Sequence, residues 1–407
     1  MLNPFAEAYV KLALATGRYD PDYIDAYYGP PEWKLEAEAA LLPLDAIQAE
    51  ARTLIDSLQA LDPSGQEEIV QLRHHYLLKQ LAAMVSRIGM LQGMTFSFDE
   101  ESRLLYDAVA PHYGEEHYQK ILDMLDGTLP GEGSLAARYE RFKQGFIIPI
   151  ERLDLVFTTA IREARKRTMA HIELPPGEHF DIEYVTGKSW SGYNWYQGNA
   201  RSLIQVNTDL PVYIDRAIDL ASHEGYPGHH VYSTLLEQHL VLERGWVEFS
   251  IYPLFSPQSL IAEGSANFGI DVAFSRNERV DFEREVLFPL AGLDPSMAED
   301  YNVVEDMVAE LSYAGNEAAL QYLNGEIEEA EAVNWLVTYA LMPVEHARRR
   351  VRFFDQYRSY VINYNLGKDL VRRYIERRGG TPSNPTRRWE LFTTLLSSPR
   401  LPSGLTE

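Results

Sequence analysis

The chain has 407 residues, of which 45% are hydrophobic and 24% charged, so it can bury a sizeable core as an ordinary globular protein. Its 60 acidic and 37 basic residues give a net charge of −23, which argues against nucleic acid or an anionic membrane as partner. The absence of cysteine excludes disulfides, thiolate zinc sites and thiol nucleophiles. No basic leader and no run of 18 apolar residues is present, so we expect a cytoplasmic protein.

Helices are predicted through the first part of the chain, because apolar residues recur there at intervals of three and four. Gly, Pro or Asp residues precede most of these segments, and Pro130-Gly131-Glu132-Gly133 is the clearest loop. The predicted helices cover residues 44–61, 67–91, 100–110, 115–125 and a long segment, 134–169.

Two short segments change to the alternating pattern of strands, residues 180–186 and 202–208, with an aromatic cluster between them. An edge strand can hold an extended peptide by main-chain pairing. Residues 202–208 stand in the right place for that role, and Asn207 within them is a candidate substrate-binding residue. A plain hairpin packed on helices is the alternative interpretation.

Helical periodicity returns for the rest of the chain, in segments 212–222, 263–274, 301–314, 317–323, 327–340, 343–364 and 365–377. The predicted fold is therefore mainly α, with a small β-sheet beside the metal-bearing helix. We expect one domain over residues 1–407. A soft division near residue 175 separates a helical scaffold, 1–175, from a metal-bearing part, 176–407.

The most informative motif is the run His223-Glu224-Gly225-Tyr226-Pro227-Gly228-His229-His230. Zinc hydrolysis needs neutral imidazoles to hold the metal and an adjacent carboxylate to deprotonate a water. The usual H-E-x-x-H motif places both histidines on one helix face. Here Pro227 stands at the position of the second histidine, as if Pro-Gly had been inserted before it.

The second ligand of this motif is either His229 or His230. In a straight helix His229 lies about 120° round from His223, and His230 lies about 10.5 Å further along the axis. Pro227 lacks the N–H of a regular turn, and Gly228 permits unusual backbone angles. If Pro-Gly loops out, His229 takes the place of the usual second ligand, and we favour it.

A third ligand is available about thirty residues later, in a segment, 259–268, that has the pattern of a helix. Glu263 is the acidic residue among its apolar and small neighbours, and a carboxylate in such surroundings needs a positive partner. Zinc is a suitable one. Asn267, one turn later, is placed to orient a histidine ligand through a hydrogen bond.

HEGYPGHH followed by a Glu-Gly-x-Ala helix resembles a bacterial family of zincin-like proteins of unknown function, related in pattern to carboxypeptidase Taq and helical oligopeptidases. Further similarity is carried by residues 96–102 and by Tyr364-Asn365-Leu366-Gly367-Lys368, so the resemblance spans about residues 90–375. It implies a helical body with a deep channel and one zinc held by His223, His229 and Glu263, with Glu224 as general base. Ser265 departs from the family, which often has an aromatic residue there.

Two late residues complete the candidate site. Tyr364 opens the family-like element and is our candidate donor to the developing oxyanion, with Tyr360 as the alternative. The basic segment before it could bind a substrate carboxylate bidentately, and Arg358 is the candidate there. Its alternative interpretation is a solvated face. His230 is retained as a candidate substrate-binding residue.

These features predict a zinc metallopeptidase of carboxypeptidase or oligopeptidase type that acts on short peptides. Two alternatives stay open: a helical binding protein with a structural zinc, and a metal-dependent hydrolase of non-peptide amides or esters. Glu224 favours catalysis, because a structural site has no need of a base beside its ligands. The sequence does not indicate the oligomeric state or which end of a peptide is attacked.

Overall fold

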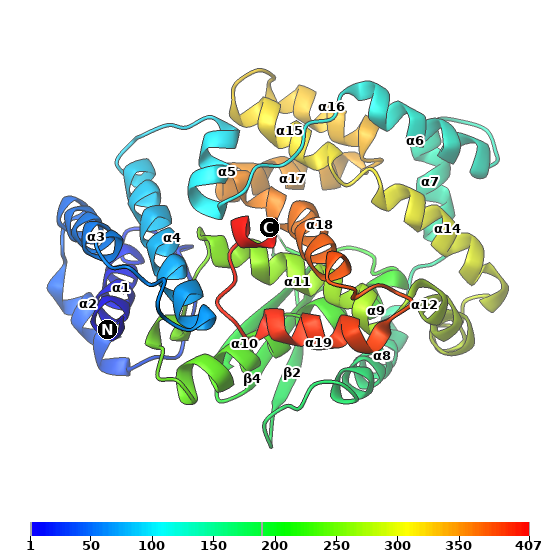
Figure 1. Ribbon diagram of the computed structural model, residues 1–407. Helices are drawn as coiled ribbons and strands as arrows, with labels where there is room; N and C mark the ends of the chain where they lie inside the picture. Colours follow the sequence, from blue (N-terminus) through cyan, green and yellow to red (C-terminus); the bar gives the residue numbers. More distant parts are fainter. Residues whose placement is uncertain (1, 189, 407) are drawn as a thin grey trace.

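Helices dominate the computed structural model, which describes residues 2–188 and 190–406 and confirms the mainly α prediction (Figure 1). The first elements are α1 (Asn3–Thr16), β1 (Ile24–Tyr27), α2 (Pro31–Ala40), α3 (Leu44–Gln59), α4 (Glu68–Leu91), α5 (Phe98–Tyr106), α6 (Glu115–Thr128), α7 (Leu135–Gln144) and α8 (Leu153–Met169). The middle elements are β2 (His179–Val185), β3 (Gly192–Gly198), β4 (Arg201–Asn207), α9 (Asp215–Leu220), α10 (His229–Leu236), β5 (Ile251–Pro253) and α11 (Pro257–Ala273). The last are α12 (Arg276–Phe282), α13 (Phe288–Ala291), α14 (Ala298–Ala309), α15 (Ala314–Leu323), α16 (Glu329–Tyr339), α17 (Val344–Tyr357), α18 (Ile362–Arg377) and α19 (Pro385–Leu396).

The helices surround α11, which runs through the middle of the molecule (Figure 1). Helices α1 to α4 form one flank, and α6, α7 and α14 to α17 form another. Helices α18 and α19 lie in front of α11, and the strands β2 and β4 lie below it. Nearly all of α11 is buried, as its central position requires. The single domain with a soft division near residue 175 stays a prediction.

Several predicted helix boundaries differ from the structure, and for three of them the backbone gives the reason. The expected helix 134–169 is two helices, because α7 ends before Gly145 and Pro149 cannot supply the N–H of a continuing turn. Helix α11 begins earlier than expected, with Pro257 in its first turn, where a missing N–H costs nothing. The expected helix 343–364 is interrupted at Arg358, whose φ of 52° ends α17.

The three-stranded sheet has the order β2-β4-β3. Strand β4 pairs with β2 in parallel and with β3 in antiparallel orientation, so both of its edges are occupied. The prediction that residues 202–208 form an edge strand free to pair with substrate is therefore wrong. Strand β3 was not predicted, because its residues were interpreted only as an aromatic cluster. Strands β1 and β5, which pair antiparallel in a second sheet, were also missed.

Helices α11 and α18 cross at a pair of glycines, Gly264 and Gly367. A Cβ on Gly264 would lie 2.4 Å from the carbonyl carbon of Gly367, and a Cβ on Gly367 would lie 2.9 Å from the Cα of Gly264. A side chain at either position would therefore force the two helices apart. The glycine pair therefore brings α18 close to α11, and with it Tyr360, which directly precedes α18 and bonds Glu263 of α11.

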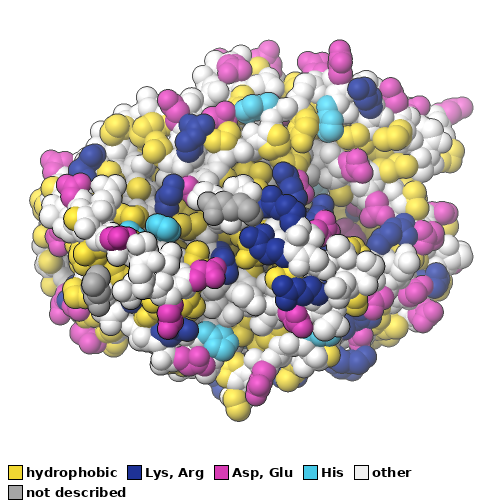
Figure 2. All heavy atoms as spheres, in the orientation of Figure 1, with side chains coloured by type: hydrophobic (Ala, Val, Ile, Leu, Met, Phe, Trp, Pro, Cys, Tyr) yellow, Lys and Arg dark blue, Asp and Glu magenta, His cyan; other side chains and the backbone are white. Residues whose placement is uncertain are grey.

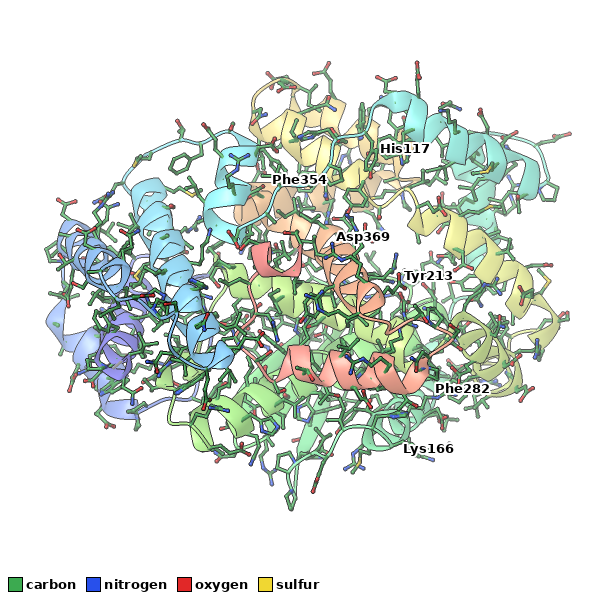
Figure 3. All side chains as sticks on the ribbon, in the orientation of Figure 1. His117, Lys166, Tyr213, Phe282, Phe354 and Asp369 are labelled. Carbon is green, nitrogen blue, oxygen red and sulfur yellow. The ribbon has the colours of Figure 1, made fainter. Side chains whose placement is uncertain are left out.

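Within the described residues, no helix combines the length and the apolar character needed to cross a bilayer. The cytoplasmic location stays a prediction. A cavity of about 750 Å³ opens beside the centre of the fold, and β1, β3, α7, α9, α11, α17 and α18 contribute to its walls. The surface is hollowed between α14 and α18 in Figure 2. Tyr213, which lines the cavity, is labelled in Figure 3.

Candidate metal centre

The HEGYPGHH motif folds as an interrupted helix. Helix α9 widens into a π-helical turn over Ala221–Gly225, where the N–H of Tyr226 bonds the carbonyl of Ala221 at 2.9 Å. The chain then loops out before α10 begins at His229. In the loop, the N–H of Gly228 bonds the carbonyl of Ser222 at 2.8 Å. A Cβ on Gly228 would lie 1.8 Å from the carbonyl oxygen of His223, so only glycine fits here.

The interruption brings His223 and His229 together, with their Nε2 atoms 3.2 Å apart. Oε2 of Glu263, on α11, lies 3.3 Å from Nε2 of His223 and 3.6 Å from Nε2 of His229. Ligand-capable atoms of His223, Glu224 and His229 also lie within 4.8 Å of one another. Two imidazoles and two carboxylates therefore converge on one point in the cavity wall.

The spacing of these atoms fits a tetrahedral zinc site. Bonds of about 2.0–2.1 Å at the tetrahedral angle place neighbouring ligand atoms about 3.3–3.4 Å apart. The three separations among His223, His229 and Glu263 lie around that value. Oε2 of Glu263 is buried and accepts no hydrogen bond within the described part of the chain, as expected of an atom that is built to bind a cation. The donor set is therefore suited to zinc.

Neighbouring side chains hold two of the three ligand candidates in orientation. Nδ1 of His223 lies 3.2 Å from Oδ1 of Asn267, which favours the tautomer that leaves the Nε2 lone pair facing the cluster. The Tyr360 hydroxyl donates to Oε1 of Glu263 at 2.8 Å, so that Oε2 faces the histidines. Asn267 was predicted to orient a histidine. The contact of Tyr360 with Glu263 could not be read from the sequence.

The electrostatics of the cluster favour a bound cation. Burial lowers the pKa of His229, but Glu263, Glu224 and Asp25 raise it more, to about 9. Burial raises the pKa of Glu263, but the two imidazoles hold it well below its usual range. In the absence of a metal ion a proton is therefore kept among these groups. A divalent cation can replace it.

Glu224 lies beside the ligand candidates, with only 5% of its surface exposed. Asn194 of β3 donates a hydrogen bond of 2.7 Å to its backbone carbonyl, which fixes the turn that carries it. Gly192 of the same strand leaves room for the carboxylate, because a Cβ there would lie 2.9 Å from Oε1 of Glu224. Strand β3 therefore shapes the pocket around the predicted base.

Tyr364 lines the cavity next to Tyr360, with ring centroids 5.8 Å apart. Burial and the charges of Glu263 and Glu224 raise its pKa well above the usual value, so the hydroxyl stays protonated and can donate. The hydroxyl group of Tyr364 makes no hydrogen bond to any described residue. The structure thus leaves the hydroxyl of Tyr364 free, whereas that of Tyr360 is engaged by Glu263.

His230 is fully buried and lies behind the cluster, away from the cavity. Its Nδ1 lies 2.8 Å from Oγ of Ser202, and its Nε2 lies 3.1 Å from Oε2 of Glu178. Glu178 also accepts from the Tyr226 hydroxyl at 2.7 Å and pairs with Arg165. The prediction that His230 binds substrate is wrong, because both ring nitrogens are used to anchor the loop.

Two further substrate-binding predictions are corrected by the contacts of the side chains. Arg358 lies outside the cavity wall, and its Nε donates to the buried carboxylate of Glu101 at 2.6 Å. Asn207 lines the cavity, but its amide nitrogen donates to the carbonyls of Lys188 and Trp190. Its amide oxygen accepts from the backbone N–H of residue 209 at 3.0 Å. Asn207 shapes a loop, and no polar group of its side chain is left for substrate.

Asp25 of β1 is a cavity residue that sequence reasoning missed. Burial raises its pKa to about 6, against a hydrogen bond from the Tyr193 hydroxyl that lowers it, and its charge acts on His229. No local pattern marks this aspartate, because only the pairing of β1 with β5 carries it to the cavity. The basic segment that the sequence indicated for a carboxylate does reach the cavity, but through Arg349 and Arg350 of α17 and not through Arg358.

Comparisons with known proteins find similarity only in structure, because no family model and no curated protein matches the sequence. A protein of Colwellia psychrerythraea, provisionally described as a lipoprotein, has a TM-score of 0.56 at 14% identity, covering 92% of this chain and 71% of that one. A structure named BsuCP has a TM-score of 0.52 at 11% identity, covering 98% and 88%. The M32 carboxypeptidase of Deinococcus radiodurans has a TM-score of only 0.38 at 11% identity, covering 96% and 90%.

At these identities the similarity concerns the fold and not the chemistry. The Colwellia psychrerythraea protein and BsuCP match along nearly the whole of this chain. The chain therefore shares its mainly helical fold with these two structures.

Proposed function

We propose that this protein is a zinc-dependent hydrolase that cleaves short peptides, with Glu224 as general base. The observation that carries the proposal is the convergence of His223, His229 and Glu263 at the spacing of tetrahedral ligands, with the Glu224 carboxylate beside them and all four side chains lining the cavity. When bound there, zinc supplies Lewis acidity, which polarises a carbonyl and lowers the pKa of a water to about 7. The cavity of about 750 Å³ suits a short, extended chain.

The residues around the cluster are assigned to proton transfer, oxyanion stabilisation and substrate binding. The Glu224 carboxylate takes the proton from the attacking water and passes it to the leaving amine. The free hydroxyl of Tyr364 donates to the oxyanion that develops on the carbonyl oxygen. Strand β3 lies at an edge of its sheet and lines the cavity, so its backbone can pair with an extended peptide. It thereby takes the role that the sequence analysis expected of β4.

A purely structural zinc is the weaker candidate. Structural zinc sites are closed by four protein ligands, whereas His230, the nearest further imidazole in sequence, is committed to Ser202 and Glu178. Glu224 faces the cavity in the place where a catalytic base is needed. Non-peptide amides and esters are the substrates to try next if no peptide is cleaved.

Metal content is the first test. Protein purified without chelator should contain one zinc per chain by elemental analysis, and His229→Ala should lose it because the variant lacks one of three ligands. His230→Ala is the matched control in the same motif and should retain zinc at saturating metal. Zinc lost only from the His230 variant would contradict the assignment of the ligands.

Catalysis is tested with a peptide library and with Glu224→Gln. The amide keeps the shape of the carboxylate but cannot accept a proton, so zinc content and fold should persist while turnover falls by several orders of magnitude. Unchanged turnover would show that Glu224 is not the base. Absence of cleavage by the native, zinc-loaded protein across the library would contradict the peptidase proposal itself.

A further inference from the structure

Helix α17 presents one basic and aromatic face to the cavity. The residues of this face follow each other at intervals of one, three or four, which places them on the same side of a helix. They are His346, Arg349, Arg350, Phe353 and Tyr357. Phe354, labelled in Figure 3, is fully buried at the border of this face, where the guanidinium of Arg350 lies 5.7 Å from its ring, and it anchors the helix in the core.

The three basic side chains of this face have no acidic partner. Within the described residues, His346, Arg349 and Arg350 make no hydrogen bond or ion pair. Burial and the charge of Arg349 lower the pKa of His346, although Glu140 of α7, which forms no ion pair with it, acts in the opposite direction. Arg349 and Arg350 thus keep two positive charges on this face without a counter-charge among the described residues. The chain has a net charge of −23, so it contains many acidic residues that could pair with these two arginines.

Other basic residues show how unusual this face is. Lysines and arginines also gather over α18 and α19 in Figure 2. There Lys368 lies 3.0 Å from Asp271, and Arg372 lies 3.4 Å from both Asp271 and Asp369. Inside the cavity, two other cations of the described chain are also paired: Lys143 with Glu305 at 2.8 Å, and Arg216 with Asp219 at 3.6 Å.

Arg350 is the best-defined member of the three. Its guanidinium lies over the rings of Phe353 at 4.7 Å and of Tyr364 at 5.7 Å, which holds its plane in one orientation. Its Nε is buried and has no hydrogen-bond partner. Burial lowers the pKa of Arg350, so the charge is partly desolvated and not compensated within the described residues. A bound anion would compensate it.

The position of Arg350 relates it to the metal centre. Arg350 and the candidate ligands line the same cavity, and Tyr364 is near both, because its ring lies 5.7 Å from the Arg350 guanidinium and the charges of Glu263 and Glu224 act on its hydroxyl. We propose that Arg350, supported by Arg349 and His346, binds a carboxylate of the substrate. This inference rests on the proposed function, because it assigns the part of the substrate that lies beside the scissile bond.

A guanidinium recognises a carboxylate through two parallel hydrogen bonds, which adds direction to the charge. The carboxylate could belong to the C-terminus of a peptide or to an acidic side chain, because both present the same planar group. Arg358, the residue that the sequence indicated for this task, is excluded by its bond to Glu101. The proposed anion site is therefore at Arg350 in the cavity wall, about two helical turns before Arg358.

Binding tests the inference separately from catalysis. Three probes are titrated into chelator-treated protein by calorimetry: acetyl-Ala-Ala, its C-terminal amide, and acetyl-Ala-Glu-amide, which carries only a side-chain carboxylate. The first should bind about 10- to 100-fold tighter than the amide, as expected for a charge-assisted hydrogen-bonded pair. If the third also binds tightly, the subsite accepts acidic side chains as well.

Arg350→Gln should abolish the preference for the acid while leaving the affinity for the amide unchanged. Arg352→Gln is the matched control, because Arg352 is on the same helix but exposed. In the zinc-loaded protein the same Arg350 variant should raise KM for carboxylate-bearing peptides by about 10- to 100-fold, with little change in kcat. Should Arg350→Gln not fold, Arg350→Lys and Arg349→Gln keep a charge nearby and should weaken the preference.

Equal affinity for acid and amide in the native protein would overturn the inference, as would no binding of any probe at millimolar concentration. An acid preference that survives in Arg350→Gln and Arg349→Gln would overturn it too. These outcomes are distinct from failure of the proposed function, which would appear as absent zinc or absent hydrolysis while the acid preference persisted.

Discussion

Gly192 sets the position of the predicted base although it has no side chain of its own. A methyl group there would lie 2.9 Å from Oε1 of Glu224 and 2.6 Å from a methyl group of Leu220. Gly192→Ala should therefore displace the carboxylate and lower kcat by about 10²-fold, the scale of a misplacement of about 1 Å. Zinc content should not change. Gly315→Ala is the control, since a methyl group there meets nothing within 4 Å.

The paired tyrosines of the cavity should respond in opposite ways. Tyr364→Phe removes a free donor and should lower turnover by about 10²–10³ without loss of zinc. Tyr360→Phe removes the bond that orients Glu263 and should weaken zinc affinity by about 10- to 100-fold, while turnover at saturating zinc stays near native. Each variant is the control for the other. Identical effects of both on turnover would mean that neither role is assigned correctly.

Much of the convergence of candidate ligands could be predicted because the motif is local. The histidines, Glu224 and the Pro-Gly interruption are adjacent in sequence, and helical spacing relates Asn267 to Glu263. Long-range contacts could not be predicted. Arg358 and His230 carry suitable chemistry, but distant carboxylates, Glu101 and Glu178, bind them elsewhere.

At the scale of elements, Glu178 connects the start of β2 to the metal motif. It accepts from Tyr226, lies 3.1 Å from Nε2 of His230, and pairs with Arg165 of α8, so it fixes the loop on both sides of Pro227. Glu178→Gln should lower the melting temperature and weaken zinc affinity by about 10- to 100-fold. Because the residue is remote from the cavity, kcat at saturating zinc should persist.

Glu163→Gln serves as the control for that measurement. Glu163 also forms ion pairs on α8, with Lys166 and Arg167, but it has no contact with the motif. An equal loss of zinc affinity in both variants would indicate a general effect of charge. A fall in kcat of the zinc-saturated Glu178 variant would contradict a purely positioning role.

Helix positions were predictable from periodicity, whereas strand order was not. The apolar spacing that indicates a helix is a property of one segment, and most predicted helices are present. The place of β4 depends on its two neighbours, β2 and β3, and one of them contains too many aromatic residues and glycines to show alternation. The edge strand of the sheet is therefore β3, which was not predicted, and not β4, which was.

For the whole molecule, the metal centre predicts how stability depends on pH. In the metal-free protein the pKa of His229 rises from 6.5 to about 9, so its stabilising contribution is complete below pH 6.5 and is lost as pH rises through 9. The pKa of Glu263 is lowered, so its contribution is present above pH 4.5 and is lost as pH falls. The melting temperature of chelator-treated protein should therefore fall between pH 6.5 and 9.

Zinc should stabilise the protein more strongly at the upper end of this pH range. A metal ion displaces the proton held by His229, so the increase in melting temperature on adding zinc should grow over the same pH range. His229→Gln should flatten the fall seen without metal. A metal-free protein whose melting temperature rises from pH 6.5 to 9, with no such rise in the variant, would contradict the protonation assigned to this histidine.

The crossing of α11 and α18 at Gly264 and Gly367 has a consequence for biosynthesis. The ribosome completes the motif and Glu263 well before it reaches Tyr360, the residue that orients this glutamate. A nascent chain thus holds all three ligand candidates while Glu263 is still free to turn away. Docking of α18 on α11 at the glycine pair brings Tyr360 to Glu263, so we expect the third candidate ligand to be aligned only when the last helices fold.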